Sequence, residues 1–308
     1  MTQPLILPDV RALLDQMEAG GGKRAVDVGL AEARNMLHAS KHLFDAPTGE
    51  LAVIHDLAGG PCPMRLYDAR AERGPGPVLV FFHGGGFVLG DLATHEPLCA
   101  EIARLADLPV VAVDYRLAPE HPFPAGVEDA ITAARWLAGS PAELERKVTS
   151  LVLAGDSAGG NFAIVAALAL RDEPAAVPVG TLWAIYPAAN PTKHYPSLDQ
   201  FGEGFLLSRD SMRWFDECYA PDPADWRYDP LLKPLAGLPP TLVVTAGLDP
   251  IRDQGRAFAA ACAEAGVTVG YLECEGTIHG FLNLRKALPS AQEALERCVR
   301  FLRQLTAA

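Results

Sequence analysis

The strongest chemical signal in the 308-residue chain is Ser157, in the motif GDSAG at residues 155–159. The apolar run LVLAG leads into it, and an apolar helical stretch at residues 162–170 follows it. A G-x-S-x-G motif at a strand-to-helix turn is typical of a nucleophile elbow, which strains the serine backbone and exposes its Oγ. Gly155 and Gly159 fit such a turn because strand and helix pass too close for a Cβ. A plain glycine-rich turn is the alternative, and the surrounding elements favour a nucleophilic serine.

Three glycines follow another apolar run, VLVFF, in the motif HGGGF at residues 83–87. Successive glycines leave backbone N–H groups open, and an H-G-G-G loop supplies such donors to an oxyanion hole. We expect the N–H groups of Gly85, Gly86 and Ala158 to hold the oxyanion of a tetrahedral intermediate. A phosphate-cradling loop is the alternative, but the chain has neither G-x-G-x-x-G nor G-K-[ST].

A candidate acid and a candidate base follow two later strand-like runs. Asp249 comes after TLVVTAG and is expected to orient a histidine through its Nδ1–H. Asp253 competes with it, but its place in the first turn of the next helix fits a dipole or capping role. His279 is the candidate base, and the order serine, aspartate, histidine favours it. His83 is the alternative base, but it precedes Ser157 and fits better as a support that hydrogen-bonds the glycine loop.

A sheet must bring these residues together, and the sequence predicts an α/β fold with a mostly parallel, eight-stranded sheet flanked by helices. The first two expected strands are joined by a Gly-Gly-Pro turn, which is typical of an antiparallel hairpin. The later ones are separated by helical stretches, and several are apolar throughout, as expected for strands covered on both faces. Ligands bind at the carboxyl ends of such strands. The expected strands are residues 51–57, 63–68, 78–82, 110–115, 151–154, 181–186, 241–246 and 268–274.

Two further segments are expected to form a lid. The first contains helical patterns at residues 10–19 and 27–40. The second is the stretch between the sixth and seventh strands, which is far longer than a crossover needs. It contains a helical pattern at residues 209–219, with Ser208 as its expected N-cap. The predicted division is an N-terminal part of the cap at residues 1–45, an inserted cap segment at 188–240, and a catalytic domain at 46–187 and 241–308.

Composition excludes several classes of partner. With 26 Lys and Arg against 38 Asp and Glu, the net charge is −12. This charge repels phosphate backbones and anionic lipid heads, so we expect neither nucleic-acid nor membrane partners. The first residues have no basic region before an apolar run, so we expect no secretory signal and a cytoplasmic location. The chain has no C-x-x-C pair and no H-E-x-x-H motif, so the sequence predicts no metal.

Five motifs occur in order along the chain: HGGGF at 83–87, DYRLAPEHPFPA at 114–125, GDSAGG at 155–160, LDPIRDQG at 248–255 and IHGF at 278–281. Together they resemble the hormone-sensitive-lipase-like esterases of bacteria, the family IV carboxylesterases of the α/β-hydrolase superfamily. The resemblance covers essentially the whole chain. It implies an α/β-hydrolase fold with a helical cap, no cofactor, and hydrolysis of carboxylic esters with short or medium acyl chains. It also implies that Ser157, Asp249 and His279 form the catalytic triad. The oxyanion donors that it implies are Gly85, Gly86 and Ala158.

The resemblance indicates which segments surround the substrate. Residues 204–215 resemble the cap helix region of the family, which covers the pocket together with the N-terminal helices. The candidate pocket walls are therefore Phe87, Phe205, Leu206 and residues 37–44. An aromatic stripe at helical spacing is also common in ordinary cores.

The segment YRLAPE at residues 115–120 resembles the family's support for the glycine loop. The charges in and directly before it suggest an ion-pair network among Asp114, Arg116 and Glu120 below the site. We therefore expect this segment to be structural rather than catalytic.

The leading hypothesis is a serine carboxylesterase that acts on small-molecule esters through an acyl-enzyme. Amide, carbamate or lactone substrates would use the same machinery and are the first alternative. The second is a small-molecule receptor, because the plant gibberellin receptors resemble this family but have lost the catalytic histidine. His279 stands in its expected setting here, which favours an enzyme. The last strand, residues 268–274, is a candidate sheet edge for a homodimer.

Overall fold

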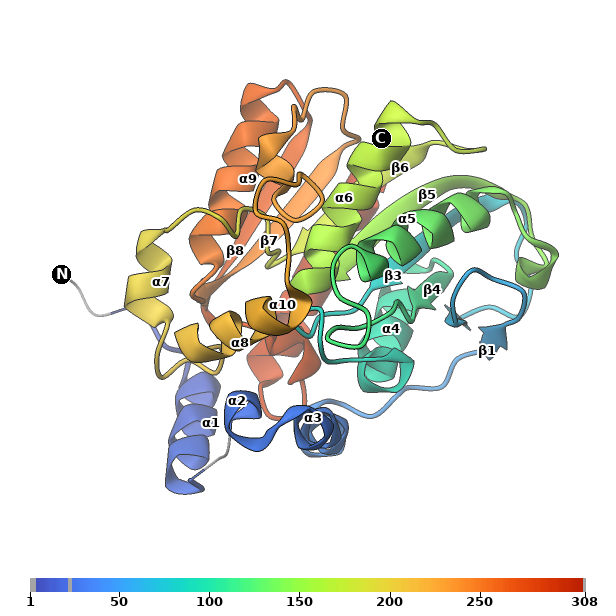
Figure 1. Ribbon diagram of the computed structural model, residues 1–308. Coiled ribbons are helices and arrows are strands. Elements are labelled where there is room, and N and C mark those ends of the chain that lie inside the picture. The colour runs from blue at the N-terminus through green and yellow to red at the C-terminus, as the bar shows by residue number, and fades with distance from the viewer. Residues whose placement is uncertain (1–3, 22–23, 307–308) are drawn as a thin grey trace.

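A computed structural model describes residues 4–21 and 24–306, so the ends of the expected domains at residues 1–3 and 307–308 lie outside it. Its centre is one eight-stranded sheet in the order β1-β2-β4-β3-β5-β6-β7-β8 (Figure 1). All eight expected strands are present, with shifted ends. They are β1 Val53–Leu57, β2 Met64–Asp68, β3 Gly76–Phe82, β4 Val110–Val113, β5 Val148–Asp156, β6 Val179–Ile185, β7 Thr241–Leu248 and β8 Val269–Ile278.

The sheet is mostly parallel, as predicted. β2 pairs antiparallel with β1 and with β4, and every other neighbouring pair is parallel. The carboxyl ends of β3 to β8 therefore share one edge, where the candidate residues of the sequence follow their strands. β8 lies at one border of the sheet and β1 at the other.

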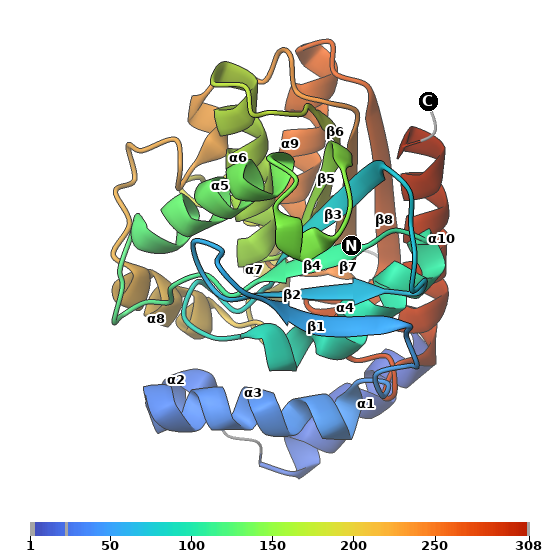
Figure 2. The ribbon, with the colours of Figure 1, turned by 90° about the vertical axis from the view of Figure 1, so that its right-hand side faces the viewer.

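Helices cover both faces of the sheet (Figure 2). In β3, Val78, Val80 and Phe82 pack with α5, α6 and α9, whereas Leu79 and Phe81 pack with α4 and α10 on the opposite face. All five of these side chains are fully buried, which explains why the strand is apolar throughout. No helix in the described part of the chain is both long and apolar enough to span a bilayer. The covering helices are α4 Leu92–Ala106, α5 Ala125–Ala138, α6 Ala158–Asp172, α9 Arg252–Glu264 and α10 Pro289–Thr306.

The N-terminal segment forms α1 Pro8–Ala19, α2 Ala25–Val28 and α3 Leu30–Phe44. The prediction of one helix over residues 27–40 is wrong because the chain leaves helical geometry at Gly29. That glycine has φ 79° and ψ 163°, a conformation open to a residue without a Cβ. Two separate helices, α2 and α3, therefore meet at this glycine.

The inserted segment carries two helices, α7 Pro196–Phe201 and α8 Arg209–Tyr219. The hydroxyl of Ser208 accepts a bond from the N–H of Ser211 at 3.2 Å, so Ser208 is the N-cap of α8, as predicted. Arg24, beside α2, forms an ion pair with Asp210 of α8 at 3.4 Å. The two segments that were expected to form a lid therefore meet. Three short 3₁₀ turns complete the described elements: η1 Ala142–Leu144, η2 Pro230–Leu232 and η3 Phe281–Asn283.

Candidate active site

Ser157 lies at the sharp turn between β5 and α6. Its backbone has φ 56° and ψ −116°, a strained conformation for a residue with a side chain. The turn is tight because a Cβ on Gly159 would overlap the carbonyl oxygen of Phe82, and one on Gly155 would overlap the carbonyl of Gly159. The side chain of Ser157 stays partly exposed. This geometry matches the strained turn that the glycine spacing predicts.

Asp249 and His279 follow the neighbouring strands β7 and β8, and the fold brings both to Ser157. The Nε2 atom of His279 is 2.8 Å from the Oγ of Ser157, and its Nδ1 atom is 2.7 Å from Oδ2 of Asp249. The other carboxylate oxygen of Asp249 accepts the N–H of Ile251 at 2.9 Å, and the Asp249 side chain is fully buried. A serine, an imidazole and a carboxylate so arranged can activate the hydroxyl and stabilise the imidazolium that forms.

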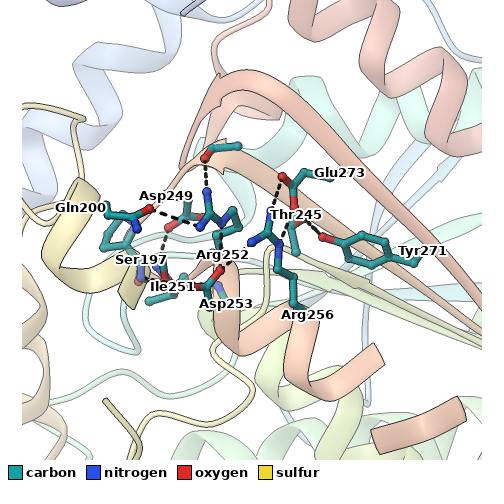
Figure 3. Close-up of polar contacts among 12 residues, drawn as sticks. Ser197, Gln200, Thr245, Asp249, Ile251, Arg252, Asp253, Arg256, Tyr271 and Glu273 are labelled. Carbon is teal, nitrogen blue, oxygen red and sulfur yellow. Dashed lines mark hydrogen bonds and ion pairs between the residues drawn. The ribbon is translucent and has the colours of Figure 1, made fainter. Parts of the chain in front are cut away.

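Asp253, the competing carboxylate, faces a different set of partners. It lies in the first turn of α9, accepts the N–H of Ser197 at 3.0 Å, and forms ion pairs with Arg252 and Arg256 (Figure 3). The hydroxyl of Ser197 in turn donates to the carbonyl oxygen of Pro250 at 2.9 Å. Asp253 thus joins α7 to the loop that carries Asp249.

His83, the competing base, lies beneath the glycine loop. Its Nδ1–H donates to the carbonyl oxygen of Gly84 at 2.8 Å, and the hydroxyl of Tyr115 donates to the carbonyl oxygen of His83 at 2.6 Å. Burial, together with the nearby charge of His95, lowers the pKa of His83 to about 4. The imidazole is therefore neutral at pH 7 and supports the loop, as expected from its place in the motif.

The glycine loop presents open backbone donors. Gly85 has φ 129° and Gly86 has φ 60°, and a Cβ on Gly85 would overlap the carbonyl group of Leu89. The carbonyl oxygen of Gly85 accepts the N–H groups of Val88 and Leu89 at 3.1 and 2.8 Å, which holds the turn closed. Among the residues that the structure describes, the N–H groups of Gly85, Gly86 and Ala158 have no hydrogen-bond partner. They are free to bind an oxyanion.

A Gly85→Ala substitution is expected to lower kcat by about 10²- to 10³-fold, because the loop must move to admit the Cβ and its donors leave their positions. KM should change little, since the donors act on the developing charge. Steady-state kinetics on p-nitrophenyl butyrate measure both. Gly74→Ala is the control, because a Cβ there meets open space. A Gly85→Ala enzyme with the wild-type kcat would contradict the assignment.

The candidate pocket walls differ in their positions. Phe87 is buried and stacks on Tyr219, with ring centroids 4.1 Å apart. Phe205 packs edge-on against Phe201 at 5.3 Å, and Leu206 is 42% exposed. The structure thus places Phe87 beside the glycine loop and leaves Leu206 largely in solvent.

Sequence reasoning did not single out Phe215 of α8, which lies against the candidate oxyanion hole. A Cβ on Gly86 would overlap its ring, so the ring rests directly on that glycine. On α8, Trp214, Phe215 and Cys218 all pack against the core. Their helical spacing was the available signal, but it does not tell which of them reaches the loop.

The expected network among Asp114, Arg116 and Glu120 is wrong, because each charge has its own surroundings. Arg116, which precedes α5, pairs with Asp129 of that helix at 2.7 Å. Glu120 pairs with Arg34 of α3, also at 2.7 Å. Burial and the charge of Asp91 raise the pKa of Asp114 to about 6, and no ion pair holds this carboxyl among the described residues.

Arg34 is the second functional candidate that the sequence analysis missed. Besides its pair with Glu120, its guanidinium donates to the carbonyl oxygens of Val88 and Ala118, both at 3.1 Å. Val88 lies directly after the HGGGF motif. The N-terminal helix α3 therefore braces the same loop that Phe215 covers.

The fold and the site define a hydrolase class in which a serine follows a central strand and its partners follow later strands. A family model described as the alpha/beta hydrolase fold matches residues 79–283, about two thirds of the chain. The chain belongs to the α/β-hydrolase family.

Curated relatives and solved structures agree with this assignment. Carboxylic ester hydrolase LipN of Mycobacterium tuberculosis is 40% identical over 84% of this chain and 72% of its own length. An ethyl acetate hydrolase of Pseudomonas putida is 36% identical over 96% of this chain and 98% of its own. An ester hydrolase from the metagenome of Lake Arreo, solved with a bipyridine phosphonate derivative, superimposes with a TM-score of 0.90 at 36% identity, covering 99% of this chain and all of that one. The resemblance to esterases read from the five motifs is thus supported over nearly the whole chain.

Proposed function

We propose that the protein is a serine carboxylesterase. The observation that carries the proposal is the hydrogen-bonded series from Ser157 through His279 to Asp249, at 2.8 and 2.7 Å. His279 takes the proton of Ser157 as its Oγ attacks the ester carbonyl, and Asp249 stabilises the imidazolium. The N–H groups of Gly85, Gly86 and Ala158 bind the oxyanion of the tetrahedral intermediate.

Collapse of this intermediate breaks the ester bond. His279 returns the proton to the departing alkoxide, so an alcohol leaves and the acyl group stays on Ser157. Water then attacks the acyl-enzyme, with His279 as the base, and releases the carboxylic acid. The reaction consumes one water and needs no cofactor.

The substrates are proposed to be small esters with short or medium acyl chains. The relatives named as ethyl acetate hydrolase and carboxylic ester hydrolase support this class. Initial rates on p-nitrophenyl esters from acetate to palmitate test it, and we expect the highest kcat/KM at the short or medium lengths. If no ester is cleaved but an amide, carbamate or lactone is, the substrate class is wrong. Tight ligand binding without any turnover would instead favour a receptor.

We also propose that residues 1–45 and 188–240 form a cap over the catalytic domain of residues 46–187 and 241–308. The contact between Phe215 and Gly86 and the bond from Arg34 to Val88, directly after the glycine loop, support it. Phe205 and Leu206, in the inserted segment, are proposed as further walls of the pocket that this cap covers.

Phe215→Ala is expected to shift the chain-length preference toward longer acyl groups. Removing the ring that rests on Gly86 opens space beside the oxyanion hole. We expect the ratio of kcat/KM for octanoate to that for acetate to rise about 10-fold, the size that one or two methylenes supply in an apolar pocket. Leu232→Ala is the control, since Leu232 lies in the same inserted segment and is 54% exposed. An unchanged ratio would remove Phe215 from the pocket.

A homodimer through β8 is proposed as the assembly. β8 borders the sheet, and Tyr271 on it and Phe301 on the adjacent helix α10 are each 43% exposed. Tyr271→Lys should convert the dimer to monomer, because a charge on an edge strand opposes pairing. Light scattering coupled to size exclusion measures this. Ile54→Lys on β1, at the opposite border, is the control. A monomeric wild type would contradict the proposal.

The protein is further proposed to act in the cytoplasm, without nucleic-acid or membrane partners. Its net charge of −12 supports the absence of nucleic-acid and membrane partners, because it repels anionic polymers and lipid heads. Fractionation of the producing cells, followed by esterase assay of each fraction, tests the location.

A further inference from the structure

The reaction proposed above leaves one buried charge beside the nucleophile without a role. Asp156 precedes Ser157 and is only 2% exposed. A buried carboxylate without partners is strongly destabilising. Here it has four partners: the N–H of Gly84 at 2.8 Å, the Nδ2 of Asn283 at 3.2 Å, the hydroxyl of Tyr186 at 3.4 Å and the Nε2 of His95 at 3.5 Å.

Three of these partners belong to different parts of the candidate active site. Gly84 is the first glycine of the loop that carries the oxyanion donors. Asn283 ends η3, shortly after His279. Tyr186 follows β6, and its ring meets the imidazole of His279 edge-on at 5.0 Å. The carboxylate of Asp156 therefore contacts the oxyanion loop and two residues near His279. Ser157 follows Asp156 directly in the chain.

The contact with the glycine loop is close-fitting. A Cβ on Gly84 would lie 2.6 Å from Oδ2 of Asp156 and 3.1 Å from its carbonyl oxygen, so only a glycine lets the loop approach this far. Burial raises the pKa of Asp156, but the charge and hydrogen bond of His95 and the N–H of Gly84 outweigh it, and the pKa lies below its ordinary value. The group is ionised at neutral pH.

We infer that Asp156 is a positioning residue, which sets the oxyanion loop and the His279 segment at the correct distance from Ser157. The inference rests on the proposed esterase function. Because the carboxylate of Asp156 accepts the N–H of Gly84, any displacement of the carboxylate moves Gly84 and, through the chain, the donors at Gly85 and Gly86. Such a residue changes the stabilisation of the transition state and leaves the binding of the ground state nearly intact.

The experiment compares Asp156→Ala with Asp68→Ala. Asp68 is also fully buried, pairs with Arg73 and Arg146 at 2.8 Å, and ends β2 at the sheet edge opposite the active site. Both variants lose a buried carboxylate and should lose thermal stability. Only Asp156→Ala is expected to lower kcat, by about 30- to 100-fold, the effect of a misplacement near 1 Å, with KM within about 3-fold of wild type.

A trifluoromethyl ketone provides the second readout, because it adds to the serine as a tetrahedral hemiketal whose oxyanion needs the loop. Its inhibition constant should rise by about the same factor as kcat falls in Asp156→Ala and stay unchanged in Asp68→Ala. Asp156→Asn should recover most of the activity, since an amide oxygen still accepts the N–H of Gly84. If Asp156→Ala does not fold, Asn283→Ala replaces it as the test. This variant removes only the hydrogen bond between Asp156 and the His279 segment, and it should lower kcat without changing KM.

The outcomes separate the two proposals. A wild type without ester turnover, or one whose turnover survives Ser157→Ala, removes the proposed function itself. An active wild type whose Asp156→Ala variant keeps kcat and the inhibition constant, and loses only stability as Asp68→Ala does, overturns the positioning role alone. A parallel loss of kcat and of inhibitor affinity in Asp156→Ala, with rescue by asparagine, supports it.

Discussion

Ser157→Ala is expected to lower kcat on p-nitrophenyl butyrate by about 10⁶-fold, the loss seen when a triad nucleophile is removed. The alanine keeps the strained backbone and the glycine contacts but has no oxygen to attack the carbonyl. A residual rate above the uncatalysed one should remain, because the loop donors and His279 stay in place. Initial rates with the two purified proteins, at matched concentrations of folded enzyme, measure the loss.

Ser290→Ala provides the matched control for this change. Ser290 lies at the start of α10, and its hydroxyl has no hydrogen-bond partner among residues 4–21 and 24–306. Its variant should hydrolyse the ester at the wild-type rate. Ester turnover that is equal in Ser157→Ala and Ser290→Ala would exclude Ser157 as the nucleophile.

Asp249→Asn is expected to lower kcat by about 10⁴-fold with the fold intact. The carboxylate accepts the Nδ1–H of His279 at 2.7 Å, which leaves Nε2 unprotonated toward Ser157. An amide at residue 249 can donate to Nδ1 instead, and the imidazole then presents the wrong tautomer to the serine. The rate of the Asp249→Asn variant should recover partly at high pH, where the hydroxyl of Ser157 loses its proton more readily.

The same substitution at residue 253 tests the choice between the two carboxylates. Asp253→Asn weakens the ion pairs with Arg252 and Arg256 but removes no contact with His279. We expect kcat within about 10-fold of wild type, since the pairs with Asp253 act only on the loop around Asp249. Parallel kinetics on the two variants decide the matter, and a larger loss at Asp253 than at Asp249 would reverse the assignment.

The sequence predicts the sheet well because its strands carry local signals. Several are apolar runs bounded by turns, and all eight appear, while the members of the candidate triad stand at or shortly after the ends of expected strands. The helix predicted over residues 27–40 fails at Gly29 since periodicity does not report the φ of a single glycine. Local pattern therefore predicts elements better than the breaks within them.

Long-range contacts account for what the sequence could not predict. The bond from Arg34 to Val88 and the contact of Phe215 with Gly86 join residues far apart in the chain. The network expected among Asp114, Arg116 and Glu120 fails for the same reason, because Asp129 and Arg34 supply partners from other elements. Charge pairing depends on which side chains the packing makes neighbours, and spacing alone does not contain that information.

The backbone at Ser157 has a consequence for the evolution of this chain. With φ 56° and ψ −116°, it matches the first central position of a type II′ turn, where glycine is the preferred residue. A side chain held in such a conformation destabilises the native state by about 1–3 kcal/mol. Selection for a durable fold alone would place glycine at this position. A serine at this position is therefore what we expect if selection also acts on the proposed chemistry, which requires the hydroxyl at the cost of native-state stability.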